Sequence, residues 1–289
     1  MPAVTVKQQQ YQTYILSDET ISSKVSVVPE RGGIITTWRI GETEIFYLDT
    51  ERFADPSLSV RGGIPLLFPI CGNLSDDTYT LNGQTYQLKQ HGFARNLPWE
   101  VTDQSVENGA SLTVSLKSNE QTREVYPFDF ELNFIYTLRG NTLELRYRHT
   151  NLSREPMPFA TGIHPYFIVT DKPQLEFDLP STQFQAKGDT SIQTFSGGFD
   201  FERDEIDVAF FNLSKSSAVV NDPSRNLKLT LNWDERYSTL VFWTVKGKDF
   251  YCLEPWSSPR NALNTGESLM TAQPGETVET FITINAEIA

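Results

Sequence analysis

Glu254 is a residue whose type and surroundings suit acid–base chemistry. In the stretch "FYCLEPWSSPRNALNTGE" it is in phase with Phe250 and Cys252, so it continues the apolar face of a predicted strand. A carboxylate on such a face is costly to bury unless it is paired, and we expect it at a strand end that a polar ligand reaches. Trp256 lies two residues on and could stack on a ligand ring. A solvated glutamate leaving a strand is the alternative interpretation.

His164 is the second candidate. In "PFATGIHPYF", Ala160 and Gly162 share a strand face with it, and such small neighbours leave space in front of an imidazole. Pro165 holds His164 extended and is expected to end strand pairing there. A histidine in a strand-end turn is the alternative. A carboxylate and an imidazole are together sufficient for proton transfer in both directions near neutral pH.

The stretch "QHGFARNLPWEV" places His91 beside a glycine and four residues before Arg95. The glycine leaves room for a close approach by backbone or ligand, although a histidine that caps a loop by hydrogen bonding fits equally well. Arg61, in "SVRGGIPLLFP", precedes a Gly-Gly turn. Both arginines could instead pair with nearby acids at the surface.

Asp207 is one of several acids in "RDEIDVAFFNLS" and is locally indistinguishable from Asp204 or Glu205. His149 differs from the other two histidines because it continues an apolar alternation, which predicts a core or strand-end position.

Patterns for metals and common cofactors are absent. The chain contains no CxxC, HExxH or His-x-His pattern, no GxGxxG or P-loop, and no GxSxG. The sequence therefore predicts neither a resident metal nor a cofactor. Its two cysteines, Cys71 and Cys252, are expected to be reduced thiols.

The elements that must position these residues are predicted to be strands, because a two-residue period dominates and long amphipathic helical patterns are absent. "FELNFIYTLRGNTLELRYRHTNLS" predicts a hairpin that turns at Gly140. Its register places Phe134 opposite Tyr147, and Leu132 opposite His149. Short strands separated by turn clusters indicate a sandwich or a barrel.

Two further hairpins follow the same pattern. One turns at Asn82-Gly83, with Tyr79 and Tyr86 as expected cross-strand partners. The other turns around residues 246–248, within "LVFWTVKGKDFYCLEPW". No low-complexity linker divides the chain, so we expect one domain over residues 1–289, with residues 1–12 as a polar tail or edge strand.

The composition of the chain limits the kinds of partner that we expect it to bind. The 289 residues carry a formal net charge of −13, which disfavours a nucleic-acid backbone as a partner. Aromatic residues make up 12% of the chain, which favours strands and stacking surfaces. The N-terminal residues lack the apolar run of a signal peptide, and no segment has the apolar length of a membrane span. We therefore expect a cytoplasmic protein without a membrane partner.

An ordered set of stretches resembles the aldose 1-epimerase (mutarotase) superfamily, and especially the branch that includes the glucose-6-phosphate 1-epimerases. The stretches are "RGGIPLLFP" at 61–69, "HGFARNLPWEV" at 91–101, "GIHPYF" at 162–167, "IDVAFFNL" from 206 and "EPWSSPRNALNTGE" at 254–267. The resemblance implies an all-β fold, a β-supersandwich of the galactose mutarotase-like type. It also implies a cofactor-free interconversion of the α and β anomers of a sugar.

The resemblance also implies roles for individual residues. Glu254 matches the catalytic base and His164 the catalytic acid. His91 matches a second active-site histidine, and Asp207 matches a sugar-binding aspartate. Arg61 and Arg95 match arginines that lie near the substrate and its phosphate in the sugar-phosphate branch, and these six residues form the site that the sequence predicts.

The chain departs from the sugar-phosphate branch at three places. "FPICGN" replaces an aromatic-rich stretch, "HPYF" is more similar to the general aldose epimerases, and Arg260 stands where a smaller or acidic residue is expected. The sequence leaves open which sugar is bound, whether it is phosphorylated, and how many copies assemble. A non-catalytic carbohydrate-binding protein on the same fold is the alternative, although it would not need both Glu254 and His164. A sugar lyase or isomerase on a related sandwich would need a base aimed at carbon.

Overall fold

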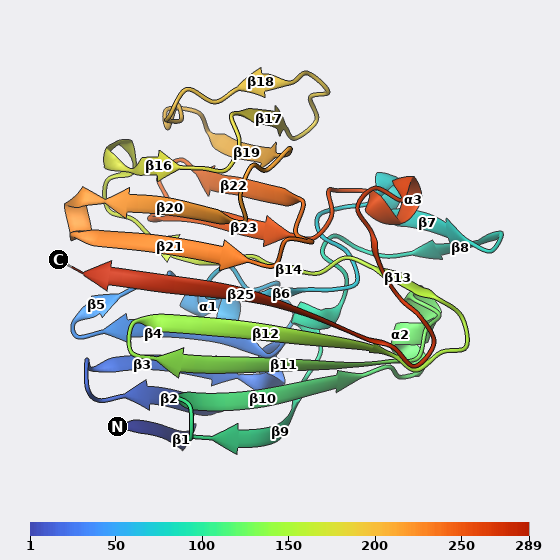
Figure 1. Cartoon of the computed structure of the whole chain (residues 1–289), viewed down its shortest axis with the longest axis horizontal. Helices are drawn as coiled ribbons and strands as arrows, with labels where there is room; N and C mark the ends of the chain where they lie inside the picture. Colours follow the sequence, from blue (N-terminus) through green and yellow to red (C-terminus); the bar gives the residue numbers. More distant parts are fainter. Residues whose placement is uncertain (289) are drawn as a thin grey trace.

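The computed structural model describes residues 1–288, and strands dominate it (Figure 1). All named strands pair antiparallel with their neighbours. The only α-helices among the described residues are short: α1 (Thr50–Ala54), α2 (Glu120–Val125) and α3 (Ala262–Thr265). None of them has the length and apolar character needed to cross a bilayer. The structure thus confirms the predicted all-β class.

Three large sheets make up most of the molecule. The longest strands form an eight-stranded sheet in the order β16 (Glu176–Asp178), β20 (Ser217–Asp222), β21 (Leu227–Trp233), β25 (Thr277–Ile288), β12 (Thr142–Asn151), β11 (Phe130–Arg139), β10 (Ala110–Lys117) and β9 (Glu100–Ser105). An N-terminal sheet has the order β1 (Pro2–Gln8), β2 (Gln12–Asp18), β3 (Ser23–Val28), β4 (Ile34–Ile40) and β5 (Thr43–Glu44).

The third large sheet carries Glu254 and Asp207, and His164 directly follows one of its strands. Its order is β18 (Gln193–Thr194), β17 (Gln183–Ala186), β19 (Glu205–Phe210), β22 (Thr239–Val245), β23 (Phe250–Trp256), β14 (Gly162–Ile163) and β6 (Leu66–Leu67), and β15 (Tyr166–Ile168) also pairs with β23. Two small pairs complete the fold, β7 (Thr78–Leu81) with β8 (Gln84–Gln87), and β13 (Met157–Phe159) with β24 (Met270–Ala272).

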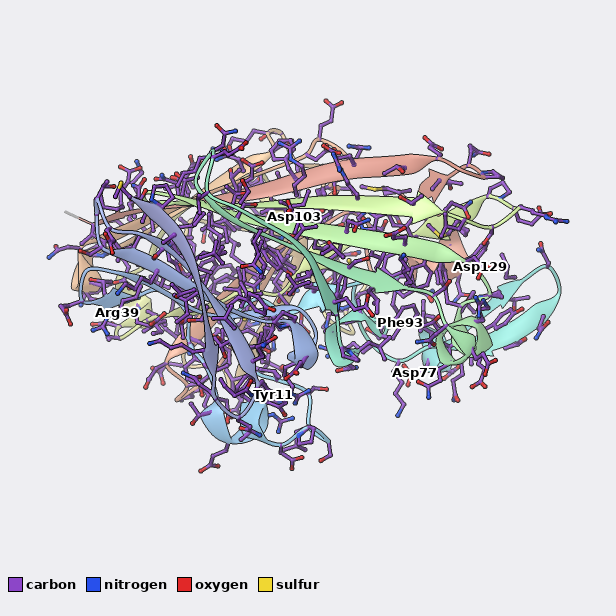
Figure 2. The ribbon with its side chains drawn as sticks, turned by 90° about the horizontal axis from the view of Figure 1, so that it is seen from below. Tyr11, Arg39, Asp77, Phe93, Asp103 and Asp129 are labelled. Atoms are coloured by element: carbon purple, nitrogen blue, oxygen red, sulfur yellow. The ribbon has the colours of Figure 1, made fainter. Side chains whose placement is uncertain are left out.

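The sheets pack face to face as a sandwich. Seen at right angles in Figure 2, the long sheet lies above the N-terminal strands, and side chains fill the space between them. One cluster of buried apolar residues runs from Leu16 to Ala286 and draws on all three large sheets. This shared core supports our proposal that the whole chain is one domain.

The predicted registers are confirmed. Phe134 pairs with Tyr147 and Leu132 with His149 across β11 and β12. Tyr79 pairs with Tyr86, and their rings stack with centroids 5.4 Å apart. Of the two interpretations of residues 1–12, the edge strand is correct, since β1 pairs along its whole length with β2. Cys71 and Cys252 are buried free thiols, as expected.

His149 lies in the core, one of the two positions that its alternation predicts. It is completely buried, and its ring stacks on Phe159 at 4.7 Å and on Phe68 at 5.7 Å. Burial lowers the pKa of His149 to about 3. The folded protein therefore holds a neutral imidazole where the unfolded chain would take up a proton below pH 6.5.

A pH dependence of stability follows from this residue. Between its unfolded pKa and about 3, acidification protonates His149 only in the unfolded chain, so stability falls as the pH falls. His149→Phe retains an aromatic ring and removes the titration. Between about pH 7 and pH 4, wild type should lose about 2–4 kcal/mol more unfolding free energy than this variant, measured by urea titration. Parallel losses in the two proteins would show that His149 titrates normally in the fold.

Candidate active site

All six sequence-predicted site residues line one cavity of about 280 Å³. They come from distant parts of the chain. Glu254 lies on β23 and Asp207 on β19, while His164 follows β14 directly. The other three lie outside strands: Arg61 after α1, His91 after β8, and Arg95 in the 3-10 turn Ala94–Asn96.

Glu254 and His164 form a close pair in the wall of this cavity. The Oε1 atom of Glu254 lies 3.4 Å from Nε2 of His164. Its Oε2 atom accepts a hydrogen bond from the indole N–H of Trp256 at 3.1 Å. The prediction that Glu254 sits at a strand end is wrong. The residue lies within β23, opposite Val241 of β22, with an exposed fraction of 1%, and it reaches the cavity because its strand face borders the opening.

Burial determines the protonation of this pair. It raises the pKa of Glu254 well above its usual range, and the nearby charge of Asp207 raises it further. Burial also lowers the pKa of His164 to about 3, with Arg95 as the second cause. Both shifts favour the neutral form of each side chain.

The backbone around His164 explains its position. Its N–H donates to the carbonyl of Pro65 at 3.1 Å, and its ring stacks on Tyr166 with centroids 4.7 Å apart. Pro165 interrupts strand pairing only briefly, because β15 resumes the pairing with Tyr166 opposite Cys252. The expectation that pairing ends at Pro165 is therefore corrected. The interruption turns the imidazole toward the cavity, beside Trp243.

The structure places His91 in a hydrogen-bonded loop that borders the cavity. Its Nδ1 atom accepts a hydrogen bond from the N–H of Gly72 at 3.1 Å, and its own N–H donates to the carbonyl of Gly72 at 2.7 Å. It is a hydrogen-bonded loop residue that also lines the cavity. Since Nδ1 is an acceptor, the hydrogen of the neutral ring sits on Nε2, which lies 3.2 Å from the side-chain amide nitrogen of Gln90. Burial holds the pKa of His91 well below its usual value.

Gly72 is needed for this arrangement. Its φ of 70° lies in the left-handed region. A Cβ atom at this position would lie 2.4 Å from Cγ of Arg260 and 3.1 Å from the ring of Trp256. The glycine therefore leaves room for the stem of Arg260 beside it.

Two basic residues hold Asp207. Its Oδ1 atom accepts a hydrogen bond from Nη2 of Arg260 at 2.6 Å, and its Oδ2 atom lies 3.4 Å from Nζ of Lys187. The structure thereby separates Asp207 from its neighbour Glu205, which accepts a hydrogen bond from the indole of Trp243 at 2.6 Å. We call Lys187, Asp207 and Arg260 together the ion bracket. This cluster was not predicted from the sequence. The one available signal was Arg260, a departure from the related sequences.

The bracket also borders a second cavity of about 660 Å³. Lys187 and Arg260 line both cavities. Other walls of the second cavity include Tyr237 and Phe211. The two spaces therefore adjoin along this bracket.

Arg61 and Arg95 are free of acidic partners within the described residues 1–288, contrary to the alternative in which they pair with surface acids. The guanidinium of Arg61 lies 6.0 Å from the ring of Trp243, and Nη2 of Arg95 donates to the carbonyl of Gln90 at 3.0 Å. The basic residues that line the cavity are Arg52, Arg61, Arg95, Lys187 and Arg260, whereas the acidic ones are Glu205, Asp207 and Glu254. A chain of net charge −13 thus presents an excess of basic groups here.

Comparisons with known proteins agree with this fold. The Slr1438 protein from Synechocystis sp. PCC 6803 has a solved structure that is 43% identical, with a TM-score of 0.95 and coverage of 100% of both chains. A galactose mutarotase-like protein from Clostridium acetobutylicum shares the fold, with 19% identity, a TM-score of 0.85 and coverage of 100% of this chain and 99% of that one.

Sequence relatives point the same way. An Escherichia coli (strain K12) protein that carries the provisional name glucose-6-phosphate 1-epimerase is 26% identical over 216 residues, 74% of this chain and 68% of that protein. The family model described as aldose 1-epimerase matches residues 16–285. With the fold, the cavity and this match in agreement, the chain belongs to the aldose 1-epimerase family.

Proposed function

We propose that this protein is a mutarotase that interconverts the α and β anomers of a hexose 6-phosphate. The observation that carries the proposal is the buried pair of Glu254 and His164, whose facing atoms are 3.4 Å apart in the wall of a polar cavity. Anomer exchange needs an acid and a base near one carbon centre, each within about 3 Å of its target oxygen. A carboxylate and an imidazole held this close meet that requirement.

The proton count of the pair suits the reaction. Ring opening removes a proton from the anomeric hydroxyl and delivers one to the ring oxygen, so the pair takes up one proton and releases one. In our proposal, one proton passes from Glu254 to His164 when sugar binds. Glu254 then acts as the base and His164 as the acid. The aldehyde group then rotates about the C1–C2 bond of the open-chain sugar. The same steps in reverse close the ring as the other anomer.

Nearby groups favour the charged form that this step needs. The indole N–H of Trp256 donates to Glu254, and Arg260 and Arg95 also act to lower its pKa. These influences oppose burial, and hydroxyl groups of a bound sugar would add further hydrogen bonds to the carboxylate. We assign His91 and Asp207 to the sugar hydroxyls, with the Nε2–H of His91 as a donor and Asp207 as an acceptor.

Arg61 and Arg95 support the phosphorylated substrate. Both line the cavity, and neither forms an ion pair with an acid in residues 1–288. A guanidinium binds phosphate through charge-assisted hydrogen bonds, which are stronger than neutral ones. Unpaired arginines beside a sugar site therefore favour an anionic sugar over a neutral one.

Glu254→Gln should abolish most turnover while leaving sugar binding largely intact. The amide keeps the shape of the side chain and loses the basic lone pair, so the rate should fall by about 10²–10⁴-fold. Polarimetry of fresh α-glucose and exchange NMR of glucose 6-phosphate measure the rate, and the fluorescence of Trp243 and Trp256 reports binding. A variant with wild-type rates would show that Glu254 is not the base. Binding of sugar by the wild-type protein without any rate above the spontaneous one would favour the carbohydrate-binding alternative.

His164→Ala should reduce turnover by a similar factor of about 10²–10⁴. His149→Ala is the matched control, because it removes a buried imidazole from the core rather than from the cavity. The control should lower the melting temperature and keep its turnover at temperatures where it remains folded. Inactivity of the His149 variant together with normal turnover of the His164 variant would contradict the assignment.

Arg95→Ala should lower activity on glucose 6-phosphate and on glucose to different extents. If Arg95 binds the phosphate, its loss should cost about 1.5–3 kcal/mol in kcat/KM for glucose 6-phosphate, the scale of a charged hydrogen bond, and much less for glucose. Arg39→Ala serves as the control, since Arg39 lies at the outer end of β4 and pairs with Glu42 at the surface (Figure 2). An equal loss on both sugars would assign Arg95 to the sugar ring or the fold. A wild-type preference for unphosphorylated glucose or galactose would remove the phosphate assignment.

A further inference from the structure

We propose that His164, Glu254 and Cys252 form a binding site for a zinc-like divalent ion, and that the ion inhibits the protein by occupying its acid–base pair. The three side chains offer one ligand atom each, and these atoms lie within 4.8 Å of one another. All three residues are buried. Cys252 has no role in the proposed chemistry.

The strand geometry places the thiol of Cys252 near Glu254 and His164. Cys252 and Glu254 are two residues apart on β23, so their side chains project from the same face. Cys252 also pairs with Tyr166, the residue on whose ring His164 stacks. The thiol therefore lies on the inner side of the pair, away from the opening, and it does not line the cavity.

One of the three ligand separations already fits tetrahedral coordination. Zinc bonds of about 2.0–2.2 Å to nitrogen and oxygen place two such ligands about 3.3–3.5 Å apart. The separation of His164 Nε2 and Glu254 Oε1 is already 3.4 Å. With a zinc–sulfur bond of about 2.3 Å, the sulfur should lie about 3.6 Å from each of the other two ligands. The sulfur lies no more than 4.8 Å from either of these atoms, so coordination requires it to approach them by at most about 1.2 Å.

The donor set selects the class of ion. Thiolate, imidazole and carboxylate together suit zinc, cobalt and cadmium, whereas magnesium and calcium require oxygen ligands. Three protein ligands leave a fourth position, which would face the cavity and hold water. On binding, the thiol and carboxyl protons pass to solvent. The sequence patterns typical of zinc sites miss this cluster because its ligands come from two separate strand regions.

Direct binding is tested with cobalt, whose thiolate complexes absorb in the near ultraviolet. Titration of the purified protein with Co²⁺ should produce a thiolate-to-metal band that saturates at one ion per chain, and added Zn²⁺ should displace it. This readout does not depend on turnover, so it separates failure of the metal site from failure of the proposed mutarotase activity. Absence of the band would overturn the proposal.

Variants of the two cysteines assign the site. Cys252→Ser and Cys252→Ala should keep anomer exchange in chelator-treated protein, remove the cobalt band, and weaken zinc inhibition by at least about 10-fold. Cys71→Ser is the matched control, because Cys71 is also a buried free thiol but lies outside the cluster. The charge of Glu254 also raises the pKa of Cys71. The band and inhibition of Cys71→Ser should match wild type.

Thermal unfolding establishes that each variant is folded before the comparison is made. Mg²⁺ at the same concentrations should not inhibit. Zinc inhibition that persists unchanged in both folded Cys252 variants would overturn the proposal, as would loss of the band in Cys71→Ser alone.

Discussion

The burial of a carboxyl group within β23 is the constraint on which the site depends. Every residue of this strand is buried, and strands flank it on both sides. Glu254 is therefore almost wholly removed from water, and its carboxyl oxygens take their partners from the protein. Trp256 on the same strand supplies one hydrogen bond, and His164 faces the other oxygen.

The approach of His164 depends on the absence of a side chain nearby. Gly162 pairs with Trp256, and a Cβ atom at Gly162 would lie 2.8 Å from the carbonyl oxygen of Pro255 and 3.0 Å from the ring of Trp256. A larger residue would push β14 away from β23 and carry the imidazole with it. The distance between His164 and Glu254 thus depends on the close contact of two backbones.

Local sequence patterns predicted the parts of the fold that depend on neighbouring residues. The alternation around Gly140 gave the register of Phe134 and Tyr147, and the core position of His149, because hairpin contacts are short in sequence. The ion bracket could not be predicted in this way, since Arg260 reaches Asp207 across 53 residues. The position of Glu254 within β23 was also missed, because a local pattern does not show which buried polar groups find partners.

The ion bracket has a consequence for the size of substrate that the site admits. The separation between the two adjoining cavities depends on the side chains of Lys187 and Arg260, which line both, and not on backbone alone. A substitution can replace a side chain without altering strand pairing. A cavity wall made of backbone cannot be changed in this way. The length of the cleft is therefore a property that can diverge between relatives by single substitutions while the buried pair and the sandwich around it stay the same.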